Sequence, residues 1–280
     1  MTFSIVARAA DGGSWGVAVA SKYLAAAATV PAARVGAGAI ATQAWVNVAY
    51  KPDALARLAA GAGAAEVVAA LTTADPGAAV RQVGVVDAGG GSASYTGAQC
   101  TPWAGGRSGA GYAVQGNILA GEQVVAAMEH SWLAGDPSGP LAHRLVAALL
   151  AGDRAGGDRR GRQSAGVLVV SAAPGPQGSG RDADGHCDLR VDDHPDPVPE
   201  LARLLGLHDL YFGTADPATA LPLTGRLAAE VTARLARLGH ADLDSWAGVE
   251  NYENRLLPGA IDPPVLAALR AAAPDTTLAT

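Results

Sequence analysis

The order of strand and helix patterns along the chain constrains its fold more than any other feature. Segments with period-2 alternation or β-branched and aromatic residues come in groups, and helical patterns follow them in pairs. The predicted strands are 2–8, 15–21, 35–43, 81–87, 92–96, 112–116, 164–171 and 187–192, and the predicted helices between them are 52–60, 64–73, 121–132, 140–150 and 198–207. Grouping without strict β-α-β alternation favours an α+β fold with antiparallel sheets over a doubly wound parallel sheet.

Composition narrows the class of protein further. Of the 280 residues, 49% are hydrophobic and 16% are charged, which suffices for a buried core. The net charge of −6 argues against nucleic acid as a partner, since there is no excess of Lys and Arg to displace counterions.

No apolar run approaches the ~20 residues of a membrane span, and Met1–Ser4 starts no signal peptide, so a cytoplasmic protein is expected. Cys100 and Cys187 lack CxxC spacing, so neither a cysteine zinc site nor a disulfide framework is expected. No cofactor is expected either.

A second, smaller domain is predicted at the C-terminal end. Composition changes after Phe212, and the prolines at 217 and 222 bracket a linker. Beyond it lie helical patterns at 225–238, 243–254 and 263–272, with no strand pattern. We therefore predict a main domain over 1–213, with a flexible surface loop at 174–185, and an all-helical domain over 217–280.

The N-terminal hairpin predicts what lies opposite Thr2. Its bulky apolar residues are expected to share one face: Phe3, Ile5, Trp15, Val17 and Val19. They do so only if the numbers of paired residues have an even sum, since a slip by one residue moves a side chain to the other face. A sum of 24 pairs Ile5 with Val19 and Thr2 with Lys22. We therefore expect Thr2 in a central strand with Lys22 on the same face.

Thr2 has a possible chemical role at this position. Met1 before a small residue is normally removed, which leaves Thr2 with a free α-amine whose pKa is about 7.7–8.0. That amine can take the proton of the Thr2 hydroxyl directly or through water and so activate it as a nucleophile. A nearby Lys22 ammonium would lower the amine pKa. A β-branched residue at the start of a strand is equally ordinary without any catalytic role.

Asn117 is a second candidate, because it follows a short strand and precedes a helix. A side-chain amide at such a point can donate a hydrogen bond to a developing oxyanion. The alternative is that Asn117 caps the helix or occupies a left-handed turn.

Two charged segments supply the remaining candidates. Segment 156–164 combines glycines with Asp158, Arg159 and Arg162, and an Arg fork can bind a substrate carboxylate; a solvated turn is the alternative. Segment 191–197 ends a strand, and its Asp196 is a good N-cap before Pro197. Asp192, Asp193 and His194 in the same segment could bind a metal or hold a base, and this choice stays open.

Taken together, six segments in order resemble the bacterial family catalogued as domain of unknown function 1028. They are TFSIVAR (2–8), GVAVASK (16–22), ATQA (41–44), QGNIL (115–119), GDRRGRQS (157–164) and VDDHPDP (191–197). That family is grouped with the N-terminal nucleophile hydrolases, which implies a four-layer αββα sandwich whose first residue after processing attacks an amide. On this resemblance Thr2 matches the nucleophile, and Ser21, Lys22 and Asn117 match positions near it.

The resemblance leads to an expected function. We expect an amidohydrolase acting on a small-molecule amide, active as a homo-oligomer, with Thr2, Lys22, Asn117 and Ser21 in the catalytic site. Substrate binding is expected from Gln43, Asp158, Arg159, Arg162, Asp193 and His194. The segment LDSWAGVEN (243–251) is similar to a peptidoglycan-binding module attached to this family. The alternative is therefore a non-catalytic binding or scaffold protein that works through its C-terminal module.

Overall fold

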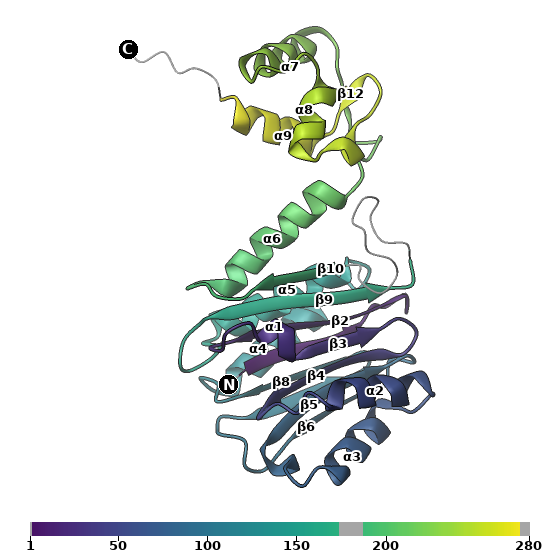
Figure 1. Ribbon diagram of the computed structural model, residues 1–280, viewed down its shortest axis with the longest axis vertical. Coiled ribbons are helices and arrows are strands. Elements are labelled where there is room, and N and C mark those ends of the chain that lie inside the picture. The colour runs from purple at the N-terminus through teal and green to yellow at the C-terminus, as the bar shows by residue number, and fades with distance from the viewer. Residues whose placement is uncertain (1, 174–186, 275–280) are drawn as a thin grey trace. The chain divides into compact units, whose positions relative to one another are not determined.

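A six-stranded antiparallel sheet organises the larger part of the chain (Figure 1). The computed structural model describes residues 2–173 and 187–274, so Met1 and the loop expected at 174–185 lie outside it. In the order β10-β9-β2-β1-β8-β7, the strands are Cys187–Val191, Ser164–Ser171, Ser14–Ser21, Thr2–Arg8, Tyr112–Asn117 and Gly105–Gly109. β1 is therefore an interior strand, as predicted. β7 is not predicted, because its sequence GGRSG contains no β-branched or aromatic residue.

A second sheet of four strands packs against the first. In the order β3-β4-β5-β6, its strands are Pro31–Arg34, Gly38–Ala44, Arg81–Asp87 and Ser92–Thr96. The β5–β6 hairpin has the predicted bounds. The strand predicted at 35–43 starts only at Gly38, because 34–38 form the turn between β3 and β4. The short helix α1 (Ala26–Thr29) leads into β3, and neither element is predicted.

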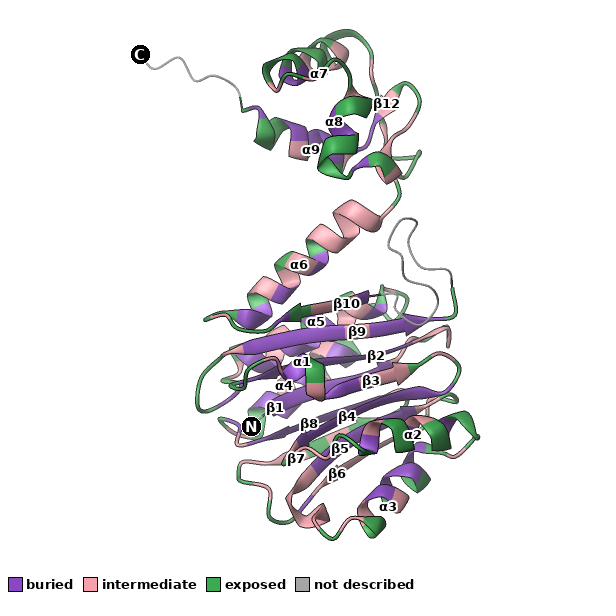
Figure 2. Cartoon of the chain, in the orientation of Figure 1, coloured by how far each residue is buried: buried purple, intermediate pink, exposed green. Residues whose placement is uncertain are grey.

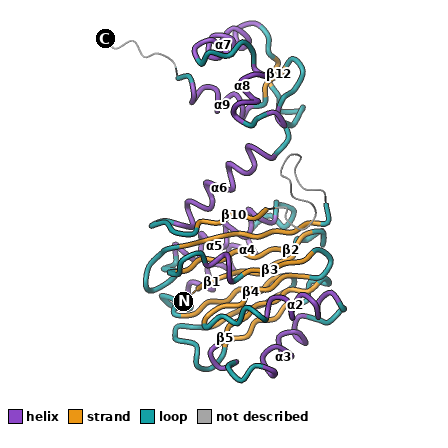
Figure 3. The backbone as a smooth tube through the Cα atoms, viewed as in Figure 1, coloured by secondary structure: helices purple, strands orange, loops and turns teal. Residues whose placement is uncertain are grey.

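Helices cover the outer face of each sheet and complete four layers (Figure 3). α2 (Tyr50–Ala59) and α3 (Ala64–Ala74) pack on the four-stranded sheet, and the 3-10 turn Ala78–Val80 leads into β5. α4 (Gln123–Ala134), α5 (Leu141–Arg154) and the start of α6 (Pro197–Phe212) cover the six-stranded sheet. The result is the expected α+β fold with a helix-sheet-sheet-helix arrangement.

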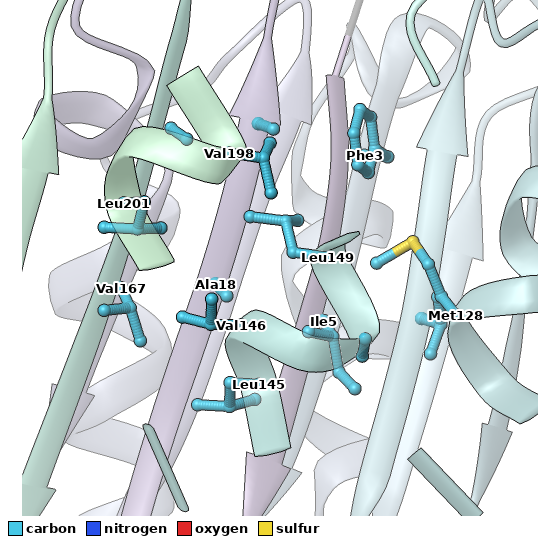
Figure 4. Close-up of a cluster of buried hydrophobic side chains, with 14 of the residues drawn as sticks. Phe3, Ile5, Ala18, Met128, Leu145, Val146, Leu149, Val167, Val198 and Leu201 are labelled. Carbon is cyan, nitrogen blue, oxygen red and sulfur yellow. The ribbon is translucent and has the colours of Figure 1, made fainter. Parts of the chain in front are cut away.

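The pairing of β1 with β2 corrects the register expected for the hairpin. Phe3 lies opposite Ala20 and Ile5 opposite Ala18, so the paired numbers sum to 23 and not 24. Phe3 and Ile5 face the helices, where Leu149 and Met128 pack around them (Figure 4). The even sum is wrong because the sheet is buried on both faces, so its bulky residues are divided between two cores (Figure 2).

The other face of β1 forms the core between the two sheets. Val6 of β1 packs there with apolar residues of both sheets: Trp15, Val17, Val19, Ala39, Ala41 and Val86. On this face the β1–β2 pairing brings Thr2 level with Ser21, not with Lys22. The prediction that Lys22 lies opposite Thr2 is therefore wrong.

The second compact unit comprises the described residues 206–274. Its helices are α7 (Gly225–Arg237), α8 (Leu243–Glu250) and α9 (Pro263–Ala272), with a 3-10 turn at Glu253–Arg255. Their core is formed around Trp246, and Leu210 and Tyr211 pack on it, so the division between the units falls inside α6 and not at 213–217. The unit is also not purely helical, because β11 (Leu221–Pro222) pairs with β12 (Ala260–Ile261).

No helix within 2–173 or 187–274 has the length and the apolar character needed to cross a bilayer.

The packing of β1 predicts a large difference between two aliphatic truncations. Ile5 is fully buried, whereas 62% of Leu133 on α4 is exposed. Ile5→Ala should lower the free energy of unfolding of the first unit by about 2–5 kcal/mol, since it leaves a cavity. Leu133→Ala should change it by less than about 0.5 kcal/mol. Urea denaturation of both variants measures this, and equal losses would contradict the described core.

Candidate functional site

Thr2 and Ser21 form a pair of buried hydroxyl groups at one end of the sandwich. The Oγ1 atom of Thr2, the first residue of β1, lies 3.1 Å from Oγ of Ser21, the last residue of β2. Only 6% of Thr2 and 2% of Ser21 is exposed. The antiparallel pairing of β1 with β2 thus brings the candidate nucleophile to Ser21, which sequence analysis had named as a site residue.

Asn117 lies on the other side of Thr2. It is the last residue of β8 and is paired with Thr2 across the β1–β8 ladder. It therefore belongs to a strand and neither caps a helix nor adopts a left-handed conformation, which is found instead at Ile118, with φ of 49°. Its Nδ2 donates to Oε1 of Gln82 at 2.8 Å and lies 3.5 Å from the Thr2 carbonyl oxygen.

Gln82 is the centre of this site, and sequence analysis missed it. It lies on β5 and is fully buried. Its Oε1 accepts hydrogen bonds from Nδ2 of Asn117 and from Nε2 of Gln43, each at 2.8 Å. Its Nε2 donates to the Gly116 carbonyl at 2.7 Å and to Oγ1 of Thr96 at 2.9 Å. Gln82 therefore connects the second sheet, through β5, to the first sheet, at the end of β8 that is paired with Thr2.

Gln43 carries this network to the backbone of Thr2. Its Nε2 donates to the Thr2 carbonyl at 3.2 Å, and its Oε1 accepts from Oγ of Ser4 at 2.7 Å. The side chain is fully buried with both polar atoms engaged. Gln43 therefore holds Thr2 in place from inside the sandwich, and the structure does not present it to a substrate as expected.

Gln115 adds a further polar side chain to the same space. Its Nε2 donates to Oγ of Ser4 at 2.7 Å, while its Oε1 accepts no hydrogen bond from any described residue. Gly84 makes room for it, because a Cβ there would lie 2.1 Å from Oε1 of Gln115. A sequence signal for this network existed: Gln43, Gln82 and Gln115 each lie inside a predicted apolar strand, where a glutamine has to be paired.

Lys22 and Asp158 lie at the edge of the site and not opposite Thr2. The Lys22 backbone N–H donates to Oδ2 of Asp158 at 2.7 Å, and Nζ of the exposed Lys22 donates to the Arg162 carbonyl at 3.2 Å. Asp158 also accepts from the Arg160 backbone N–H at 2.9 Å. Asp158 is thus a buried anchor of the charged segment, which is not a freely solvated turn.

The arginines of this segment differ in how they are used. Arg162 binds Oδ1 of Asp153 at 2.8 Å and Oδ1 of Asp196 at 3.0 Å, and the bond to Asp153 raises the pKa of its guanidinium. The chain itself thus supplies the two carboxylates that Arg162 binds, whereas a substrate carboxylate was expected. Arg159 is exposed, and its backbone N–H donates to the Ile118 carbonyl at 3.3 Å.

Asp193 and His194 stabilise the turn before α6. Asp193 accepts from Nε2 of Gln163 at 3.2 Å, and Nδ1 of His194 accepts from the Asp196 backbone N–H at 3.0 Å. The Asp196 carbonyl accepts from the Glu200 N–H at 3.2 Å at the start of α6, while its side chain binds Arg162. The described ranges contain no group of three or more His, Cys, Asp or Glu residues placed to hold a metal ion.

The arrangement favours chemistry at a hydroxyl group. The site brings together a threonine hydroxyl, a second hydroxyl and a carboxamide, which are groups found in nucleophilic and oxyanion-stabilising sites. Beside Ser21, a cavity lined by Phe3, Asp158 and Arg162 has a volume of about 10 Å³, which is the space of a single water.

Comparison with known proteins supports the resemblance described above. A family model, described as a family of unknown function (DUF1028), matches residues 2–201. A crystal structure of a protein from Silicibacter pomeroyi with the same family designation is 28% identical, with a TM-score of 0.65, and the alignment covers 82% of this chain and 92% of that one. No curated protein gives a significant match.

The glutamine network predicts that Gln82 matters for stability. In Gln82→Leu, the buried amides of Gln43 and Asn117 lose their shared acceptor, at about 1–3 kcal/mol for each unsatisfied group. We expect the free energy of unfolding to fall by about 2–5 kcal/mol in total. The matched control is Gln99→Leu at an exposed glutamine, which should change the free energy of unfolding by less than about 0.5 kcal/mol. Chemical denaturation would contradict the network if the two variants behaved alike.

Proposed function

The chain belongs to the family of unknown function DUF1028, and we propose from its site that it is an amidohydrolase with Thr2 as nucleophile. One observation carries the proposal: Thr2 Oγ1 is bonded to Ser21 Oγ at the buried start of an interior strand, paired there with Asn117. The reaction class rests on this geometry together with the α-amine that Thr2 would gain on removal of Met1.

The proposed reaction has two balanced steps. Thr2 Oγ attacks the amide carbonyl carbon, and its proton passes to the α-amine, directly or through water. The C–N bond then breaks, and the leaving amine takes the proton from the ammonium group, which leaves an ester on Thr2. Water attacks this ester with the α-amine again as base, the resulting ammonium returns the proton to Thr2 Oγ as the ester C–O bond breaks, and the carboxylic acid product is released and loses its proton to solvent.

The surrounding residues have supporting roles in this proposal. Ser21 orients Oγ1 of Thr2, because the 3.1 Å contact allows only some rotamers of the threonine. Asn117 donates to Gln82 at 2.8 Å and to the Thr2 carbonyl at 3.5 Å, and the N–H of this longer contact is the one that would turn to a developing oxyanion. Gln43 holds the Thr2 carbonyl.

Lys22 has a different proposed role from the one expected. The pairing that placed it opposite Thr2 is wrong, and its ammonium donates to the Arg162 carbonyl. We assign it to holding the 158–163 segment next to the site. All of these residues precede 206, so we assign the chemistry to the first unit alone.

Removal of the Thr2 hydroxyl provides the direct test. In a screen of small amides, ureides and dipeptides, Thr2→Ala should lower kcat at least about a thousandfold, since no other group takes over a lost nucleophile. Thr2→Ser keeps the hydroxyl and should retain measurable turnover. Thr72→Ala removes a threonine hydroxyl on α3 and is the matched control, with wild-type kinetics expected.

Two outcomes would contradict the proposal. Turnover by Thr2→Ala at the wild-type rate would show that another group is the nucleophile. Intact-mass measurement showing that Met1 is retained in active protein would exclude the α-amine as base.

A base with the pKa of an α-amine also predicts the pH profile. The amine accepts a proton only when it is neutral, so kcat/KM should fall about tenfold per pH unit below about 7.7–8.0. The loss should reverse on return to higher pH, with an unchanged unfolding midpoint between pH 6 and 8 as the control. A flat profile between pH 6 and 9 would contradict the amine as base.

The second candidate function is a non-catalytic binding protein on the same fold. Two observations favour it: Thr2 is only 6% exposed, and the cavity beside Ser21 has the volume of one water. Absence of turnover throughout the screen, with Met1 retained, would support this function. Binding would then be sought in the second unit, where 243–251 resembles a peptidoglycan-binding module.

A further inference from the structure

A pocket of about 380 Å³ opens at the other end of β1 from Thr2. Arg8, the last residue of β1, lines it together with Arg144 of α5. Its wall also includes Trp132, Leu133, Gly90 and Gly111. At about 3.3 Å per residue, six residues of β1 separate this pocket from Thr2 by roughly 20 Å. It is therefore a feature distinct from the candidate site.

Arg8 has a buried polar atom with no partner. Its Nε has no hydrogen-bond partner, and no carboxylate of the described residues forms an ion pair with its guanidinium. The group lies over the Trp15 ring, 6.0 Å from the ring centroid. It also lies against Gly12, where a Cβ would approach Nη2 of Arg8 to 2.1 Å. Packing thus fixes the guanidinium, while its buried Nε has no acceptor among the described residues.

Arg144 is held in a similar way. Its guanidinium stacks on Trp132, 3.8 Å from the ring centroid, and its Nε is also buried without a partner. Nη1 and Nη2 donate only to the carbonyls of Pro137 and Trp132, at 3.4 and 3.3 Å. Burial lowers the pKa of Arg144, and nearby Asp136 opposes that shift without lining the pocket.

The charges of the pocket are therefore unbalanced. Two guanidinium groups line it and no carboxylate does. Most other arginines of the described chain, such as Arg162 and Arg203, bind carboxylates of the chain itself. A buried donor without a partner is costly, and a guanidinium fork matches the oxygen spacing of carboxylate and phosphate groups.

We propose that this pocket is a binding site for a small molecule carrying an oxyanion, a phosphate or carboxylate, held between Arg8 and Arg144. The volume exceeds that of a bare ion and lies near the lower end of the range for small-molecule sites. The Trp132 and Leu133 side chains would contact the apolar part of such a ligand. The site is independent of the function proposed for Thr2.

Calorimetric titration of the full chain tests this site with three matched probes. Phenyl phosphate and phenylacetate carry the two oxyanions, and benzyl alcohol is their uncharged counterpart. We expect saturable binding of at least one anion and none of benzyl alcohol at the same concentration. The tighter of the two anions identifies the source as phosphate or carboxylate. Binding of neither anion, or equal binding of all three probes, would overturn the proposal.

Substitutions locate the binding in the pocket. Arg8→Gln and Arg144→Gln should each weaken binding of the tighter anion at least about tenfold, since each removes charge-assisted hydrogen bonds. Arg57→Gln on α2, whose arginine pairs with Asp53, is the matched control and should leave the affinity unchanged. Unchanged affinity in both pocket variants would overturn the proposal.

A second pair of variants covers the case in which the arginine variants do not fold. Leu133 lines the pocket but is 62% exposed, so its replacement does not disturb the core. Leu133→Glu puts a carboxylate beside the two arginines and should weaken anion binding at least about tenfold. Leu133→Gln has the same shape without the charge and should bind the anion at least about tenfold more tightly than Leu133→Glu. Equal affinities for these two variants would overturn the proposal.

Discussion

The position of Thr2 depends on two hydrogen bonds that share one acceptor, the Oε1 atom of Gln82. Its two donors come from different sheets, Gln43 from β4 and Asn117 from β8. The rest of the space between the sheets is filled by apolar side chains, whose packing is non-directional. Hydrogen bonds of defined geometry therefore fix the relation of the two sheets at the Thr2 end, and the bond from Trp15 Nε1 to the Asp87 carbonyl at 3.2 Å joins them at the other end. Because Gln43 also binds the Thr2 carbonyl, the same network fixes the start of β1.

This polar network requires a sheet that is buried on both faces. Thr2, Ser4 and Val6 point toward the second sheet, whereas Phe3 and Ile5 point toward α4 and α5. A strand exposed on one face could hold the same polar groups in contact with water at little cost. Between two sheets each of them needs a partner from the protein, which makes their arrangement specific.

Much of this fold could be predicted from the sequence, since period-2 patterns gave β1, β2, β5, β6 and β9 to within a residue. The glycine-rich β7 could not, because its pairing with β8 comes from tertiary context and not from propensity. The register predicted for β1 and β2 is wrong because both faces of the sheet are buried, whereas the prediction requires all bulky residues on one face. Asn117 was a candidate from its place after a strand and Ser21 from the family resemblance, whereas placing Gln82 in the site required knowing that β5 lies against β8. Arg162 was expected at a substrate because its partners Asp153 and Asp196 are distant in sequence.

The pairing of Thr2 with Asn117 also has a consequence for the order of events during synthesis. β1 and β2 are close together in the sequence, so their hairpin can form as soon as both have left the ribosome. The other neighbour of β1 in the sheet follows more than a hundred residues later, so one edge of β1 stays open until β8 has been made. The backbone groups of β1 that pair with β8 therefore stay accessible to solvent and to other chains during this interval, and that access closes once β8 pairs with β1.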